Sequence, residues 1–282
     1  MKLKDLDETQ APLLDHLIEL RGRLVKAVGA LTLAFVACFY FADRIFGFLV
    51  LPLTRAFPDG QGRLVYTKLY EAFFVEVKVA LFAAFFVSFP IIANQIWQFV
   101  APGLYAKEKR AFLPFLIATP VLFFAGGALA YFVVMPLAFT FFLDFQGTAG
   151  GLPAEALPAM GDYLDLVMRF ILAFGISFLL PVLLMLLNGA GLVTRDQLVA
   201  ARRYVIVLVF AVAAIITPPD VVSQILLATP LLLLFEGSLI LMRMSERKRA
   251  REAAAEAEAA GEELAEAVSE ATTEGQADPS KS

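Results

Sequence analysis

Long uninterrupted apolar runs dominate the pattern of hydrophobic and polar positions along this chain. A helix needs about 20 apolar residues to cross roughly 30 Å of hydrocarbon. Six runs reach or approach that length, over residues 24–42, 73–94, 112–143, 167–188, 204–217 and 223–242. We therefore predict an all-α polytopic membrane protein with six transmembrane helices.

Three of these runs need separate interpretation. The first follows basic residues like a signal peptide, but its length and the absence of a small-residue cleavage site favour a retained span. The run at 112–143 is long enough to combine a tilted span with an interfacial turn. The fourteen residues of 204–217 cover only about 21 Å as a helix. That span requires a thinned bilayer or shielding by partner helices.

Lysine and arginine are distributed unequally between the two sides of the predicted spans. Most of them fall on one side if the N-terminus is cytoplasmic, which predicts cytoplasmic N- and C-termini. The chain then divides into a cytoplasmic amphipathic segment (1–23), a membrane domain (24–242) and a cytoplasmic tail (243–282). The tail is basic and then rich in Ala and Glu, which indicates a partly helical or disordered extension, with disorder favoured. On the far side, residues 43–72 and 144–166 are expected to form ordered turns.

Proline is frequent within the predicted spans, where each ring removes a backbone hydrogen bond and bends its helix. The positions are Pro90, Pro114, Pro120, Pro136, Pro181 and Pro230. These prolines are compatible with ordinary kinks or with a wall of bent helices that leaves one face concave. We adopt the concave scaffold as the prediction.

The composition excludes several kinds of chemistry. Hydrophobic residues make up 60% of the chain and charged residues 18%, and the chain has one cysteine (Cys38) and one histidine (His16). This inventory provides no disulfide within the chain, thiolate metal site or Cys–His nucleophile. We therefore predict no enzyme activity, cofactor or metal. A proton-coupled secondary transporter that uses Glu76 or Glu236 is the alternative, although no inverted repeat is visible.

Several polar residues near the span ends have ordinary structural explanations. Glu19 can pair with Arg23 four residues later, and Glu108 can stabilise the start of a helix. Asp220 is a candidate N-cap for the last helix. Lys78 lies close enough to a span end to extend its ammonium towards the interface.

Taken in order, the motifs of the chain resemble the TatC family, the multi-span receptor subunit of the twin-arginine protein translocase. The resemblance extends from about residue 12 to residue 243. Its pieces are H-L-I-E-L-R-x-R-L at 16–24, L-P-L at 51–53, F-F-x-x-x-K at 73–78, Q-x-W-x-F-x-x-P-G-L-Y at 95–105, A-Y-F-V-V-x-P-L-A-F at 130–139, F-G-I-S-F at 174–178 and T-P-P-D-x-x-S-Q at 217–224.

The resemblance implies a receptor for signal peptides that carry consecutive arginines. Such receptors work in the bacterial inner membrane with TatB- and TatA-type single-span proteins, and they export folded proteins with the proton-motive force. Self-association is expected, and nucleic acid is not a partner. The resemblance implies signal-peptide binding at Glu19, Arg21, Phe99 and Glu108.

The same resemblance implies two further groups of residues. Partner docking is expected at Thr217, Asp220, Gln224 and Glu236, and far-side structural roles are expected for Pro52 and Phe73. One position departs from the family pattern. Many relatives carry a glutamate or glutamine directly after the F-G-x-S-F run, where this chain has Leu179.

Overall fold

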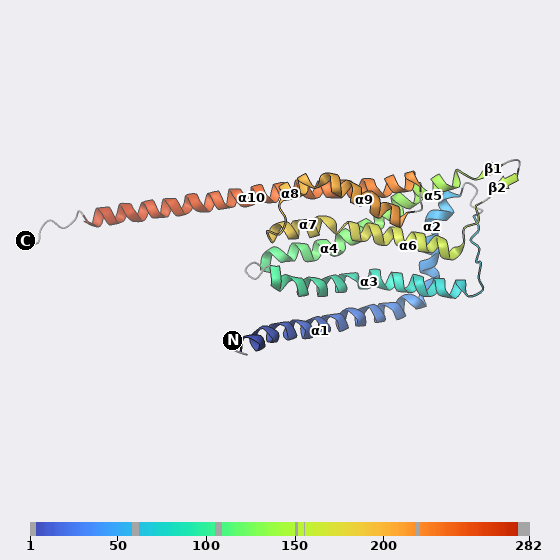
Figure 1. Ribbon diagram of the computed structural model, residues 1–282, viewed down its shortest axis with the longest axis horizontal. Helices are drawn as coiled ribbons and strands as arrows, with labels where there is room; N and C mark the ends of the chain where they lie inside the picture. Colours follow the sequence, from blue (N-terminus) through green and yellow to red (C-terminus); the bar gives the residue numbers. More distant parts are fainter. Residues whose placement is uncertain are drawn as a thin grey trace, which may run out of the picture.

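The protein is almost entirely helical in a computed structural model that describes residues 4–57, 62–104, 109–149, 152–154, 156–217 and 220–275. Its long helices lie side by side along one direction (Figure 1). The elements are α1 (Lys4–Tyr40), α2 (Ala42–Ala56), α3 (Glu71–Leu104), α4 (Lys109–Leu129), the π-helical η1 (Ala130–Val134), α5 (Met135–Leu143), β1 (Gly147–Ala149), β2 (Leu152–Ala154), α6 (Met160–Ser177), α7 (Leu180–Gly189), α8 (Arg195–Ala200), α9 (Arg202–Ile216) and α10 (Val221–Gly275). The two short strands pair as an antiparallel hairpin.

Within the described residues, five helical segments are long and apolar enough to cross a membrane. They are Leu17–Tyr40, Glu71–Phe99, Phe115–Leu143, Met160–Gly189 and Val221–Glu252. The prediction of an all-α polytopic membrane protein is therefore confirmed. The remaining predicted span corresponds to α9, which has only 15 residues. The count of six crossings stays a prediction.

The structure differs from the sequence prediction in two of the spans. The run at 112–143 contains no interfacial turn, because α4, η1 and α5 follow one another as helix from Lys109 to Leu143. The fourth span begins at Met160 instead of residue 167, since the polar residues at the start of α6 continue the helix outward. The first turns of α6 therefore include charged residues, Asp162 and Asp165, that lay outside the predicted span.

Two predicted non-span segments are also more helical than expected. Most of the 15-residue helix α2 (Ala42–Ala56) lies within residues 43–72, and its apolar pattern did not stand out in the sequence because Gly47 and Pro52 interrupt it. Residues 243–275 continue α10 as helix in place of the favoured disorder. Figure 1 shows this part of α10 extending well beyond the other helices, at the end of the bundle where the N-terminus also lies.

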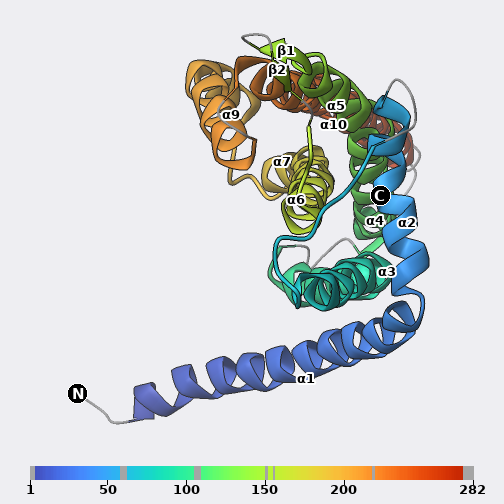
Figure 2. The ribbon, with the colours of Figure 1, turned by 90° about the vertical axis from the view of Figure 1, so that its right-hand side faces the viewer.

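Helix α1 is the outermost helix of the bundle and packs mainly on α3 (Figure 2). Small residues allow this close approach, with Ala80 and Ala84 of α3 buried against Cys38 and Ala42. A hollow of about 400 Å³ opens beside this contact and is lined almost entirely by apolar side chains from α1, α2, α3, η1 and their neighbours, including Phe48, Phe86, Phe124 and Phe132. The hollow supports the concave scaffold that the prolines suggested.

Proline 52 breaks the backbone hydrogen bonding of α2, and a tyrosine from another helix repairs it. The carbonyl of Phe48 would normally accept from the N–H four residues later, but Pro52 has none. The hydroxyl of Tyr131 donates to that carbonyl, and the Tyr131 ring stacks on Phe48 with centroids 4.5 Å apart. The hydroxyl of Tyr163 donates to the neighbouring carbonyl of Leu49 at 2.8 Å.

A second proline helps to position Tyr131. Pro136 cannot donate to the carbonyl four residues earlier, and the helix before it widens into the π-helical η1, which contains Tyr131. The N–H of Met135 bonds to the carbonyl of Ala130, five residues earlier, as a π-helix requires. Two prolines and two tyrosines thus join α2, η1 and α6.

We predict that Tyr131→Phe lowers the free energy of unfolding by about 1–3 kcal/mol, because it leaves the Phe48 carbonyl without a partner. In a Pro52→Ala background the loss should shrink, since the amide N–H restored at position 52 can satisfy the same carbonyl. Chemical unfolding in detergent micelles measures both effects. Tyr40→Phe, at a tyrosine that is 83% exposed, is the matched control and should change little. An equal loss in both backgrounds would contradict the assignment.

Candidate functional site

The signal-binding candidates on α1 lie on the exposed surface of that helix. Glu19 pairs with Arg23 four residues later, as predicted from their spacing, and the Glu19 side chain remains 43% exposed. Arg21 is also exposed. An exposed i,i+4 ion pair contributes only about 0.3–0.5 kcal/mol. Arg23 is therefore a weak competitor for the Glu19 carboxylate.

The end of α3 is fixed to α4 by a hydrogen bond between helices. The indole N–H of Trp97 donates to the hydroxyl of Thr119 at 2.7 Å, and this hydroxyl in turn donates to the carbonyl of Phe115. Phe99 follows Trp97 on the last turns of α3 and is half-buried. Glu108 lies outside the described residues, and the described chain resumes at Lys109. The Trp97–Thr119 bond therefore joins the two helices that precede and follow the segment containing Glu108.

Three of the partner-docking candidates meet where α9 gives way to α10. The Thr217 hydroxyl is buried and donates to the carbonyl of Ala213 at 2.9 Å. The Asp220 carboxylate accepts the N–H of Ser223 at 2.6 Å, which confirms Asp220 as the N-cap of α10. The Gln224 amide donates to the carbonyl of Phe210 on α9 at 2.9 Å. Of these three contacts, the bond from Gln224 joins α10 to α9, and the other two are local to the helix ends.

Glu236 is not part of this group. It lies twelve residues beyond Gln224 on α10, which corresponds to about 18 Å along the helix. Its carboxylate accepts from the guanidinium of Arg202 at 2.7 Å, at the start of α9. The structure therefore gives Glu236 a partner within the chain.

The two far-side candidates have different environments. Pro52 is buried in α2 beneath the tyrosine contacts described above. Phe73 is 58% exposed near the start of α3, where its ring contacts Phe74. Pro52 thus has a structural explanation, whereas the exposed ring of Phe73 is available to lipid or to another protein.

Leu179 occupies the break between α6 and α7. It packs against an aromatic cluster that contains Phe89 and the fully buried Phe123. Pro181, two residues later, cannot donate a backbone hydrogen bond and marks the start of α7. An apolar residue at 179 therefore fits the surroundings that this chain provides.

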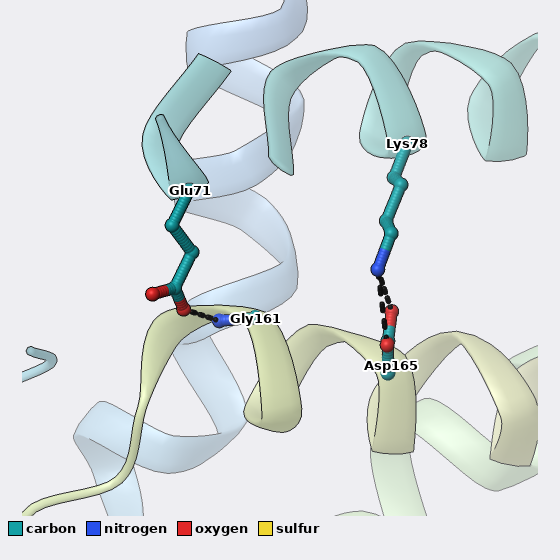
Figure 3. Close-up of polar contacts among 4 residues, drawn as sticks. All are labelled: Glu71, Lys78, Gly161 and Asp165. Carbon is teal, nitrogen blue, oxygen red and sulfur yellow. Dashed lines mark hydrogen bonds and ion pairs between the residues drawn. The ribbon is translucent and has the colours of Figure 1, made fainter. Parts of the chain in front are cut away.

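An ion pair that joins α3 to α6 was not recognised from the sequence (Figure 3). Lys78 does not simply extend towards the interface, because its ammonium donates to both carboxylate oxygens of Asp165, at 2.8 and 3.0 Å. Asp165 and Arg169 stand four residues apart on α6. This i,i+4 spacing could have indicated that the two residues lie on one face of a helix. The prediction started the span at residue 167, so it assigned Asp165 to a loop and Arg169 to a helix.

Comparison with known proteins identifies the family. Residues 15–230 match the family model of the Sec-independent protein translocase protein TatC. The chain is 51% identical to the TatC protein of Magnetococcus marinus over 245 residues, which cover 87% of this chain and 89% of the relative. It is 38% identical to the TatC protein of Escherichia coli over 231 residues, 82% of this chain and 87% of the relative.

The chain belongs to the TatC family. A crystal structure of a twin-arginine translocase receptor, TatC, superimposes with a TM-score of 0.72 at 38% identity and covers 82% of this chain and 99% of that one. TatC proteins are components of a protein translocase, so this chain is not an enzyme. Membership of this family does not favour the secondary transporter either.

We predict that Thr119→Val changes the fluorescence of Trp97, the only tryptophan in the chain. The substitution keeps the side-chain shape but removes the acceptor for the indole N–H, so the emission maximum should move to shorter wavelength. The free energy of unfolding should fall by about 1–3 kcal/mol.

Thr140→Val is the matched control, because Thr140 also donates to the carbonyl four residues earlier but lies on α5. Its emission spectrum should equal that of the unmodified protein. If both variants shifted the emission equally, the Trp97–Thr119 bond would not be the cause.

Proposed function

We propose that this TatC-family chain binds twin-arginine signal peptides of folded proteins at the cytoplasmic end of its helices, and that it recruits TatB- and TatA-type single-span partners for export driven by the proton-motive force. The observation that carries the proposal is the exposed carboxylate of Glu19 on a chain that matches a twin-arginine translocase receptor over most of its length. In this proposal Glu108 supplies the second carboxylate, and Arg21 and Phe99 contribute to the same recognition, as the family resemblance implies.

Two carboxylates select an arginine pair but do not bind a signal peptide tightly by themselves. The planar guanidinium binds a carboxylate through two hydrogen bonds, which an ammonium cannot reproduce. Each such contact contributes about 1.5–3 kcal/mol, whereas micromolar affinity requires about 8 kcal/mol. The difference comes from burial of the signal's apolar segment against the helices and lipid, at about 0.8 kcal/mol per CH₂ group.

We further propose six crossings with both termini in the cytoplasm of a bacterial inner membrane. The two chain ends lie at the same end of the bundle in Figure 1, which supports an even number of crossings. Helix α9 is about 22 Å long, shorter than the hydrocarbon layer. A sixth crossing therefore requires the bilayer to thin around α9 or partner helices to cover it.

Partner docking is proposed at the α9–α10 turn. Thr217 ends α9, Asp220 caps α10 and the Gln224 amide joins the two helices, and the exposed apolar side chains along α9 include Val207, Leu208 and Ile215. A single-span helix that packs there would cover a helix too short to span the bilayer alone. Glu236, paired with Arg202 at the start of α9, lies at the other end of this helix pair, where the same partner helix would pass.

We predict that Glu19→Ala and Glu108→Ala each weaken binding of a twin-arginine signal peptide by roughly ten- to a hundredfold, the loss of one charge-assisted contact. Crosslinking of a labelled signal peptide to the purified receptor measures this. A signal with lysines in place of the arginine pair should bind weakly to the unmodified protein and lose little more in either variant. Unchanged binding of the arginine signal in both variants would contradict the proposal.

The crossing of α9 can be tested with single cysteines in a Cys38→Ala background. Leu192→Cys precedes α8 and α9, Val221→Cys follows α9, and Leu69→Cys marks the far side, all at exposed positions. In intact cells, a membrane-impermeant maleimide should label the cysteines at 69 and 221 but not the one at 192. Equal labelling at 192 and 221 would show that α9 does not cross.

A further inference from the structure

The far halves of α3 and α6 carry a group of charged side chains that the proposed signal-binding and partner-docking residues do not include. We call Lys78, Asp165 and Arg169 the α3–α6 charged stripe. Lys78 and Asp165 form a bidentate contact between the two helices. Arg169 lies one helical turn deeper on α6, on the same face as Asp165, because residues four apart on a helix are neighbours.

The stripe is held in place by an anchor at its outer end (Figure 3). The Glu71 carboxylate accepts the N–H of Gly161 at 2.8 Å and also the N–H groups of Thr67 and Lys68, and so ties the start of α6 to the start of α3. A Cβ atom at Gly161 would lie only 2.9 Å from the Glu71 oxygen, so glycine permits this approach. The two helices therefore meet in a fixed register.

The side chains of the α3–α6 charged stripe are partly exposed on the surface of the helix bundle. The Lys78 side chain is 49% exposed and that of Asp165 is 35% exposed, and both line a hollow of about 350 Å³ between the helices. Charged groups at membrane depth normally face a bundle interior, a water-filled cavity or a partner. The open side of this stripe is therefore a candidate for coverage by another molecule.

Arg169 gives the α3–α6 charged stripe a net positive charge. Lys78 and Asp165 neutralise each other, whereas Arg169 is exposed and has no ion pair among the described residues. It lies nine residues after Met160, which places it about 14 Å along α6 from the outer end of the helix. A guanidinium at that depth is complementary to a carboxylate, which it can bind through two hydrogen bonds.

We propose that the α3–α6 charged stripe binds a transmembrane helix of a partner protein, and that this helix carries a carboxylate about nine residues from its far-side end, where it pairs with Arg169. The inference rests on the proposed recruitment of single-span partners and adds a contact on a different face from the α9–α10 turn. A lipid phosphate is the other anion that a guanidinium can bind in this way, and the lipid arm of the test distinguishes it from a carboxylate on a partner helix.

The test uses the purified full chain in phosphatidylcholine bilayers with synthetic single-span helices. Each helix is a Leu/Ala segment with one Glu, Gln or Leu at the ninth residue from its far-side end and a photocrosslinker one turn away. Crosslinking to the chain should be at least about tenfold greater with the Glu helix than with the Leu helix. Arg169→Glu should abolish that preference and create one for a helix with Lys at the ninth residue.

Two variants serve as controls. Arg169→Lys keeps the charge and should retain part of the preference. Arg203→Glu reverses the charge of an arginine that stacks on Tyr204 on α9, away from the stripe, and should leave the preference unchanged. Equal crosslinking of all helices to the unmodified chain would overturn the proposal. So would loss of the preference when phosphatidylglycerol is added, which would show that Arg169 binds lipid phosphate.

Binding of a twin-arginine signal peptide is measured on the same preparations. Normal signal binding together with equal crosslinking of all helices would overturn the stripe as a docking site and leave the proposed receptor function standing. Failure of signal binding alongside a preserved preference for the Glu helix would overturn the receptor function instead.

Discussion

A proline within a helix leaves the carbonyl four residues before it without its usual N–H donor, and a buried carbonyl needs a donor from elsewhere in the protein. In this chain the tyrosine contacts over α2 meet that requirement. Tyr131 donates to the carbonyl that Pro52 leaves unpaired, and Tyr163 donates to the carbonyl beside it. Because the tyrosines belong to η1 and α6, the repair of one helix also fixes the positions of its neighbours.

This fixed scaffold separates two kinds of surface. At the end of the bundle that carries both termini, Glu19 and the Trp97–Thr119 bond define the proposed recognition region. Farther along the helices, the α3–α6 charged stripe exposes charged groups and the short helix α9 exposes apolar side chains. A receptor that must bind a signal peptide on one side and recruit helices within the bilayer needs both kinds of surface on a rigid helix bundle.

Much of this arrangement could be predicted from the sequence, because transmembrane helices require long apolar runs and helix caps require particular residues. The Asp220 cap and the Glu19–Arg23 pair followed from local spacing alone. The tyrosine contacts and the Lys78–Asp165 pair could not be predicted, because they join residues 83 to 114 positions apart and depend on how bent helices meet. The helix α2 was missed since glycine and proline interrupt its apolar pattern.

We propose that this TatC-family chain reads an arginine pair for export of folded proteins. The most direct test is to replace the receptor of a bacterial cell with this chain and to follow a folded fluorescent reporter that carries either a twin-arginine signal or the same signal with two lysines. We expect export of the reporter with the arginine signal and strongly reduced export of the reporter with the lysine signal. Equal export of both reporters would contradict the proposal.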